Sequence, residues 1–92
     1  MTGPVIATKK PTTVEAWRWD GTDEVATLIC EWINSNPKTL CLAEKHPHEQ
    51  FIVLGYEYDT VKPGEWVIRD QFNDYFPLPD HVFRAVYDSP TR

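Results

Sequence analysis

The sequence has little basic charge and no cluster of it. Its nine Lys and Arg residues are scattered among fourteen Asp and Glu residues, which gives a formal net charge of −5 over 92 residues. Because a protein that binds the phosphate backbone needs a stripe of basic side chains, we expect no nucleic-acid partner. No apolar run is long enough to span a membrane, and residues 1–10 lack the apolar core of a secretory signal. We therefore expect an intracellular protein without a membrane partner.

Residue types that often carry catalysis are also scarce. Ser35 and Ser89 are the only serines and neither has the context of a nucleophile elbow, while the four glycines are isolated and form no phosphate-binding loop. Cys30 and Cys41 lie apart in a chain expected to be intracellular, so we predict free, packed thiols instead of a disulfide. These absences predict that the protein is not an enzyme and needs no cofactor.

A pair of histidines is the best candidate for a metal site. His46 and His48 can face the same way on an extended segment, and imidazoles suit zinc or nickel. Glu44 or His81 would have to supply a third ligand. A solvated polar loop explains the same residues more simply, so no metal is predicted.

Two pairs of carboxylates are candidates for acid and base chemistry. Glu57 and Asp59 share one face of an expected strand, and Asp70 and Asp74 flank an expected turn. The alternation of Glu57 and Asp59 with tyrosines favours a solvated strand face. We therefore predict no catalytic role for them.

The hydrophobic periodicity predicts one α+β domain over residues 1–92, with residues 1–11 as a loose arm. The expected architecture is a mostly antiparallel sheet of five or six short strands with one main amphipathic helix. That helix begins after Thr22 as the N-cap and ends before Pro37. Its apolar stripe consists of Val25, Ile29, Trp32 and Ile33. The expected strands cover residues 12–20 at a sheet edge, 39–43, 51–54, 58–61, 65–69 and 75–78.

Turn chemistry separates these strands. Pro63 and Gly64 suit the centre of a type II turn, and Asn73 tolerates the left-handed conformation of the next reversal. Residues 44–50 are expected to form a loop. Asp80 is expected to be the N-cap of one helical turn, and residues 82–87 fit a helix or a strand, of which the short strand is favoured.

Aromatic residues are plentiful, with four each of Trp, Tyr and Phe. Trp17 and Trp19, and likewise Tyr56 and Tyr58, share a strand face in each expected strand. Either both pairs line the core, which aromatic burial favours, or one pair belongs to an exposed patch with a nearby arginine. The candidate partner-binding residues are Trp17, Arg18, Trp19, Tyr56, Tyr58 and Arg69.

Three segments together resemble a group of small phage and prophage proteins. Residues 14–21 resemble the opening VEA-x-x-W-x-G of that group, and Pro63–Ile68 resembles its PGDWII segment. Tyr75–Pro77, with Phe83 and Tyr87 after it, is similar to its FYP…F-x-x-x-Y ending. The Trp-rich opening resembles the branch from phages of actinobacteria.

The chain departs from that group at two turns. Residues 54–57 replace its TLEG-type hairpin, and residues 69–74 replace its KGxxGE turn. Asn73 stands where the group has its second Gly. The shared motifs are turn, strand and core positions, so they identify a family without identifying a site.

The resemblance implies an accessory protein that acts in the cytoplasm of an infected bacterium, since the group has no assigned biochemical activity. We expect a non-enzymatic protein that binds and modulates a host protein of growth, division or defence. The alternative is a small-ligand or nucleotide binder that stacks a base on Trp17 and Trp19 and holds a phosphate with Arg18 or Arg69. Pairing of the edge strand within residues 12–20 would give a homodimer.

Overall fold

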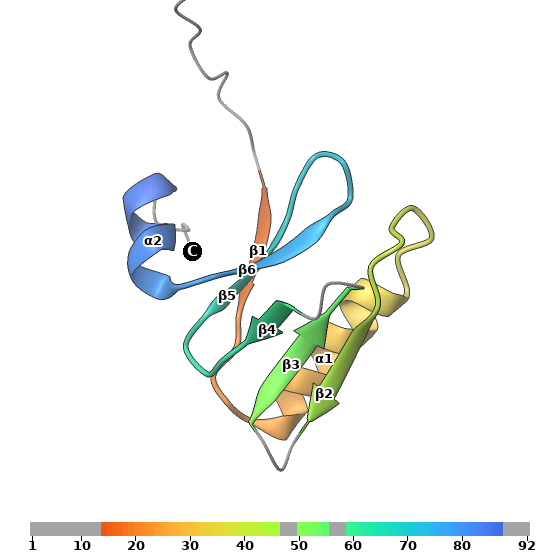
Figure 1. The fold of residues 1–92 in the computed structure, drawn as a ribbon, viewed down its shortest axis with the longest axis horizontal. Coiled ribbons are helices and arrows are strands. Elements are labelled where there is room, and N and C mark those ends of the chain that lie inside the picture. The colour runs from red at the N-terminus through yellow and green to blue at the C-terminus, as the bar shows by residue number, and fades with distance from the viewer. Residues whose placement is uncertain (1–13, 47–49, 56–58, 88–92) are drawn as a thin grey trace, which may run out of the picture.

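A computed structural model of the 92-residue chain describes residues 14–46, 50–55 and 59–87. Two helices and six strands lie in these ranges, and the strands form two three-stranded antiparallel sheets (Figure 1). One sheet has the order β1-β5-β6 and the other β2-β3-β4. The elements are β1 Glu15–Arg18, α1 Asp23–Asn34, β2 Ala43–His46, β3 Phe51–Leu54, β4 Asp59–Val61, β5 Trp66–Arg69, β6 Tyr75–Leu78 and α2 Asp80–Val86. The predicted α+β class with one main helix is confirmed.

The N-cap of α1 is the one that the sequence predicts. The Thr22 hydroxyl accepts a hydrogen bond from the Val25 N–H, and Asp23 and Glu24 place negative charge in the first turn, where the helix dipole favours it. The helix buries Ala26, Ile29 and Ile33. Their spacing matches one face of a helix with a 3.6-residue period. The apolar face that predicts the helix is therefore also the face that packs against the sheet.

The main core lies where α1 and sheet β2-β3-β4 meet one face of sheet β1-β5-β6. Trp17 stands opposite Val67, which fixes the register of β1 on β5 and puts both side chains on this face. Figure 1 shows α1 lying along the sheet of β2, β3 and β4. The buried members of the core are Trp19, Ala26, Ile29, Ile33, Ala43, Ile52, Leu54, Val61, Val67 and Tyr75.

Trp19 joins three parts of the fold. Its indole N–H donates to the Thr22 carbonyl at 2.8 Å, at the start of α1. Its backbone carbonyl accepts from the Gly64 N–H at 2.8 Å, and its N–H donates to the Glu65 carbonyl at 3.0 Å. The side chain is only 3% exposed. One residue therefore links β1, the first turn of α1 and the turn before β5.

The two turns expected from Pro, Gly and Asn chemistry are present. Gly64 has φ of +88°, and the Glu65 N–H donates to the Lys62 carbonyl, as a type II turn with Pro63 and Gly64 at its centre requires. Asn73 has φ of +63°, the left-handed conformation that asparagine tolerates. Both turns are confirmed.

The prediction for residues 39–50 is wrong in two places. Residues 39–42 are not a buried strand, and the segment expected to be a loop begins with β2 instead. The Asn34 side chain explains the start of β2 because its amide bonds both the N–H and the carbonyl of Ala43, at 2.8 and 2.9 Å. Glu44 and Lys45 are exposed on this edge strand, which is why they look like loop residues in the sequence.

The second correction concerns residues 80–87. Helix α2 continues to Val86, so the favoured interpretation of a short final strand is wrong. Asp80 is the first residue of the helix and not its N-cap, which is Pro79. The helical periodicity brings Phe83 onto Trp66, with ring centroids 3.9 Å apart and nearly parallel planes. This stack covers part of the second face of sheet β1-β5-β6.

We predict that Trp19→Phe destabilises the protein more than Trp17→Phe does. The Trp19 change removes a partly buried hydrogen bond and leaves a gap in the core, which should cost about 1 to 3 kcal/mol. Trp17 is half-buried, so the matched change should cost less. Urea unfolding followed by circular dichroism measures both losses. Equal losses would contradict the linking role of Trp19.

A second prediction concerns acid pH and Asp80. The hydrogen bond from the Trp66 indole, at 2.9 Å, and the nearby Arg84 and Arg18 guanidinium groups lower the pKa of Asp80. A lowered pKa in the folded state means that the ionised carboxylate stabilises the protein above about pH 4 and that this contribution disappears as the pH falls further. We expect Asp80→Asn to be less stable than the wild type near pH 6, with the difference shrinking towards pH 3. Urea midpoints across that range measure it, and a constant difference would contradict it.

Candidate functional site

The two tryptophans of the predicted patch are both used by the core. Trp19 is buried, and the half-buried Trp17 packs on Trp32 of α1, with centroids 5.6 Å apart. Trp32 in turn meets the edge of the Tyr75 ring at 5.1 Å. The favoured interpretation of this pair as core residues therefore agrees with the structure, and Trp19 offers no surface to a partner.

The two arginines of the predicted patch hold turns in place. Arg18 Nε donates to the Gly64 carbonyl at 3.1 Å. Arg69 forms an ion pair with Glu15 at 2.6 Å and donates from Nε and NH2 to the Asn73 side chain at 3.1 and 2.6 Å. Strand alternation also puts Arg18 on the opposite face from the tryptophans. The structure therefore does not bring these four side chains together as a stacking and phosphate-binding surface.

The remaining predicted residues are only partly described by the structure. Tyr56, Tyr58 and His48 lie outside the described residues. His46 stacks on Phe51, with centroids 5.1 Å apart, and among the described ranges no group of three His, Cys, Asp or Glu side chains is placed to hold a metal ion.

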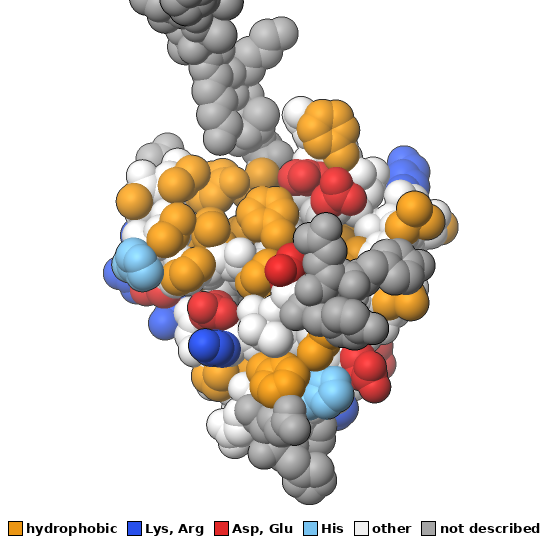
Figure 2. Space-filling view, viewed as in Figure 1, with side chains coloured by type: hydrophobic (Ala, Val, Ile, Leu, Met, Phe, Trp, Pro, Cys, Tyr) orange, Lys and Arg blue, Asp and Glu red, His pale blue; other side chains and the backbone are white. Residues whose placement is uncertain are grey.

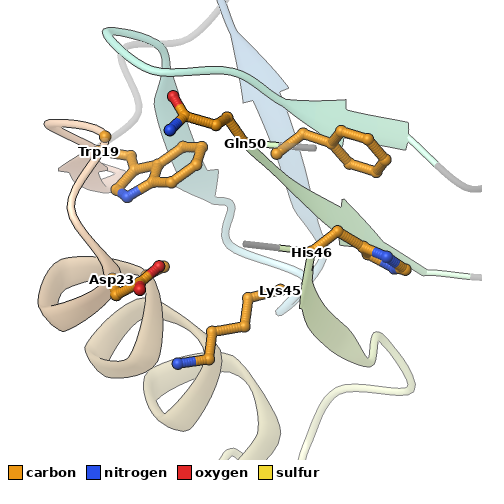
Figure 3. Close-up of a pocket in the computed structure, with 8 residues that line it drawn as sticks. Trp19, Asp23, Lys45, His46 and Gln50 are labelled. Carbon is orange, nitrogen blue, oxygen red and sulfur yellow. The ribbon is translucent and has the colours of Figure 1, made fainter. Parts of the chain in front are cut away.

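A small hollow lies beside His46, between the start of α1 and strands β2 and β3 (Figure 3). Figure 3 shows the Lys45 side chain extending towards α1 and that of His46 extending the other way. Lys45 Nζ donates to the Thr27 hydroxyl at 2.7 Å, so its charge is directed at the helix surface. The volume of the hollow is about 20 Å³, which holds about one water molecule and no nucleotide.

A larger hollow is the strongest candidate for a binding site. Its volume is about 380 Å³, within the range of ligand pockets. We call it the acidic groove and define it by its described lining: Leu40, Cys41, Leu54, Gly55, Asp59, Asp74 and Tyr75. Three parts of the chain that are distant in the sequence meet there: the segment before β2, the hairpin of β3 and β4, and the end of the turn between β5 and β6. Figure 2 shows acidic side chains beside hydrophobic ones near the turn that joins β5 to β6.

The segment before β2 supplies one wall of the acidic groove. The Gly55 N–H donates to the Leu42 carbonyl at 2.8 Å, which ties this segment to the end of β3. With its backbone held in this way, Leu40 is 82% exposed and Leu42 is 62% exposed. Two large aliphatic side chains of this segment are therefore exposed to solvent, and one of them, Leu40, lines the hollow.

The Cys41 thiol lies in the acidic groove but is not activated. Burial raises its pKa, and the negative charges of Asp74 and Asp59 raise it further, while the Gly55 N–H acts in the opposite direction. A nucleophilic cysteine needs a positive environment that lowers the thiol pKa. The surroundings of Cys41 therefore suit binding better than covalent chemistry.

Sequence reasoning missed the acidic groove for an identifiable reason. Asp59 and Asp74 are visible as carboxylates in separate segments, but only the strand pairing shows that they line the same hollow. Leu40 and Leu42 are spaced like strand residues and were expected to be buried. The sequence signal that could have corrected this prediction is Pro37 followed by Thr39, since a turn there would delay the start of the strand.

Comparisons with known proteins do not identify the chain. No family model, curated protein or solved structure matches it, so the phage resemblance stays a prediction from the sequence motifs. In the part of the chain that the structure describes, no helix is both long enough and apolar enough to cross a membrane.

We predict that Asp74→Asn speeds the alkylation of Cys41 by iodoacetamide at neutral pH. Removing one negative charge favours the reactive thiolate, and we expect a change of less than about threefold because the site is open to solvent. Cys30 is an internal control because burial raises its pKa as well, but its charged neighbours are Lys45 and Glu44. Peptide mass spectrometry measures both rates. An equal change at both thiols would indicate loosening of the fold instead.

Proposed function

We propose that this protein is a non-enzymatic phage accessory protein that binds a host bacterial protein in the host cytoplasm and modulates it. The observation that carries the proposal is the exposure of Leu40, which lines the acidic groove, and of Leu42, two residues further along the same segment. Single exposed aliphatic residues are common on protein surfaces. Two of them beside a groove form a surface that a partner protein can cover. The sequence motifs support the phage origin, and host growth, division or defence proteins are the proposed class of target.

An exposed aromatic residue also supports a binding surface. Phe72 is 72% exposed in the turn between β5 and β6, the turn that also carries Asp74. Aromatic side chains contribute strongly to interfaces because they bury a large area at a low cost in conformational entropy. Phe72 is therefore a further exposed apolar side chain on the turn that supplies Asp74 to the groove.

The chemistry of the acidic groove favours protein binding over catalysis or nucleotide binding. The raised pKa of the Cys41 thiol is the opposite of what a nucleophile needs. Two carboxylates in the lining repel the phosphates of a nucleotide. A protein segment, in contrast, can present apolar side chains to the leucines.

Capture experiments in host lysate test this proposal. We predict that tagged wild-type protein enriches a specific host protein and that Leu40→Ser combined with Leu42→Ser reduces its recovery at least about tenfold, because each leucine loses its buried contact. Quantitative mass spectrometry measures the recovery.

Leu28→Ser is the matched control, since Leu28 is also an exposed leucine but lies on α1 outside the groove lining. It should leave capture unchanged, and circular dichroism should show that all variants stay folded. Capture that is specific but insensitive to the double change would move the binding surface elsewhere. The absence of any specific host protein would contradict the proposed function.

A further inference from the structure

The acidic groove carries negative charge as well as apolar surface. Its described lining contains apolar side chains, one glycine, one protonated thiol and two carboxylates, and no basic residue. Among the described residues, the ion pairs join Arg69 to Glu15 and Arg84 to Asp80, and neither pair involves Asp59 or Asp74. Both groove carboxylates belong to exposed residues. The groove therefore presents negative charge that the described part of the fold does not neutralise.

We propose that the acidic groove binds a short segment of the partner protein that carries a Lys or Arg side chain next to a large aliphatic side chain. This inference rests on the proposed function and names the chemistry of the partner. The cationic group lies between Asp59 and Asp74. The aliphatic side chain packs on Leu40, which lines the same hollow and is exposed.

The two parts of the groove have different roles in this interaction. Contact with Leu40 removes apolar area from water and supplies affinity without regard to charge. The carboxylates supply selectivity, because a cationic segment is attracted to them and an acidic segment is repelled. The net charge of −5 acts in the same direction over a longer range and speeds the approach of a basic partner.

Hydrogen bonds fix the backbone of Asp74, so its carboxylate is well placed to bind a cationic side chain. The Asp70 carboxylate accepts hydrogen bonds from the N–H groups of Phe72 and Asp74, at 2.8 and 3.0 Å, and so fixes the turn. The Asp70 N–H also donates to the Asp74 carbonyl at 3.0 Å. The backbone of Asp74 is therefore held from both sides while its side chain is left for a ligand. Less conformational entropy is lost when a site of this kind binds.

Peptide titrations of the full chain, followed by amide chemical shifts in NMR spectra, test the inference. The probe is the peptide acetyl-Ala-Leu-Lys-Leu-Ala-amide, and its partner probe replaces Lys with Glu. We expect the Lys peptide to shift the amide signals of Leu54, Gly55 and Tyr75, and the Glu peptide to bind at least about tenfold more weakly. Binding of the Lys peptide should weaken as salt is added.

Variants assign the effect to the groove carboxylates. Asp59→Asn and Asp74→Asn should each weaken binding of the Lys peptide about threefold, the size expected for an exposed charge pair. Glu31→Gln on α1 is the matched control, since it removes an exposed negative charge outside the groove lining, and it should leave binding unchanged.

Three results would overturn the inference: no shift at millimolar Lys peptide, equal binding of the Lys and Glu peptides, or equal weakening by Glu31→Gln. Host capture that depends on Leu40 and Leu42 but not on Asp59 and Asp74 would also overturn it and leave the proposed function standing. Specific binding of the Lys peptide without any host capture would support the groove chemistry and contradict the host-protein function. The two proposals can therefore fail separately.

Discussion

The indole of Trp19 is the contact on which the arrangement of the elements depends. It occupies the junction where β1 ends, α1 begins and the chain turns into β5. A hydrogen bond to the first turn of α1 and a backbone pairing with residues 64 and 65 would each be weak alone, but the buried ring makes them one rigid unit. Trp17, Trp32 and Tyr75 continue this packing across to β6. The angle between sheet β1-β5-β6 and α1 is thus set by aromatic contacts.

Local chemistry explains which parts of this fold could be predicted. The Thr22 cap, the stripe of α1, the Pro63 and Gly64 turn, and the left-handed Asn73 depend on residues that lie near one another in the sequence, and all are confirmed. The start of β2 depends on the Asn34 side chain, nine residues away, and the extent of α2 depends on the stack of Phe83 on Trp66. The Asn34 contact leaves no periodic signal, and the pattern of residues 82–87 fits a helix and a strand equally well, so those two segments were predicted wrongly.

The same reasoning applies to the candidate site. Tryptophan and arginine are frequent in interfaces, which is why Trp17, Arg18, Trp19 and Arg69 were named as candidates for binding a partner, although the core was the favoured place for the tryptophans. Each of the two arginines instead donates hydrogen bonds to a turn residue, and the tryptophans pack in the core. In a small domain the large side chains are needed for folding, because few other residues can bury comparable area. Side chains that the fold does not use are therefore better indicators of function than residue type.

The turn between β5 and β6 shows how this small fold can combine rigidity with an open surface. Arg69 is bound to both Glu15 and the Asn73 side chain, so the turn is anchored to the edge strand β1 as well as to its own hairpin. The Asp70 carboxylate fixes the backbone within the turn. Polar side chains make all of these bonds. The side chains of Phe72 and Asp74 take no part in the described contacts, and both are directed outwards. The aromatic and arginine contacts thus fix the domain, and this allows it to expose an apolar and acidic surface at its edge.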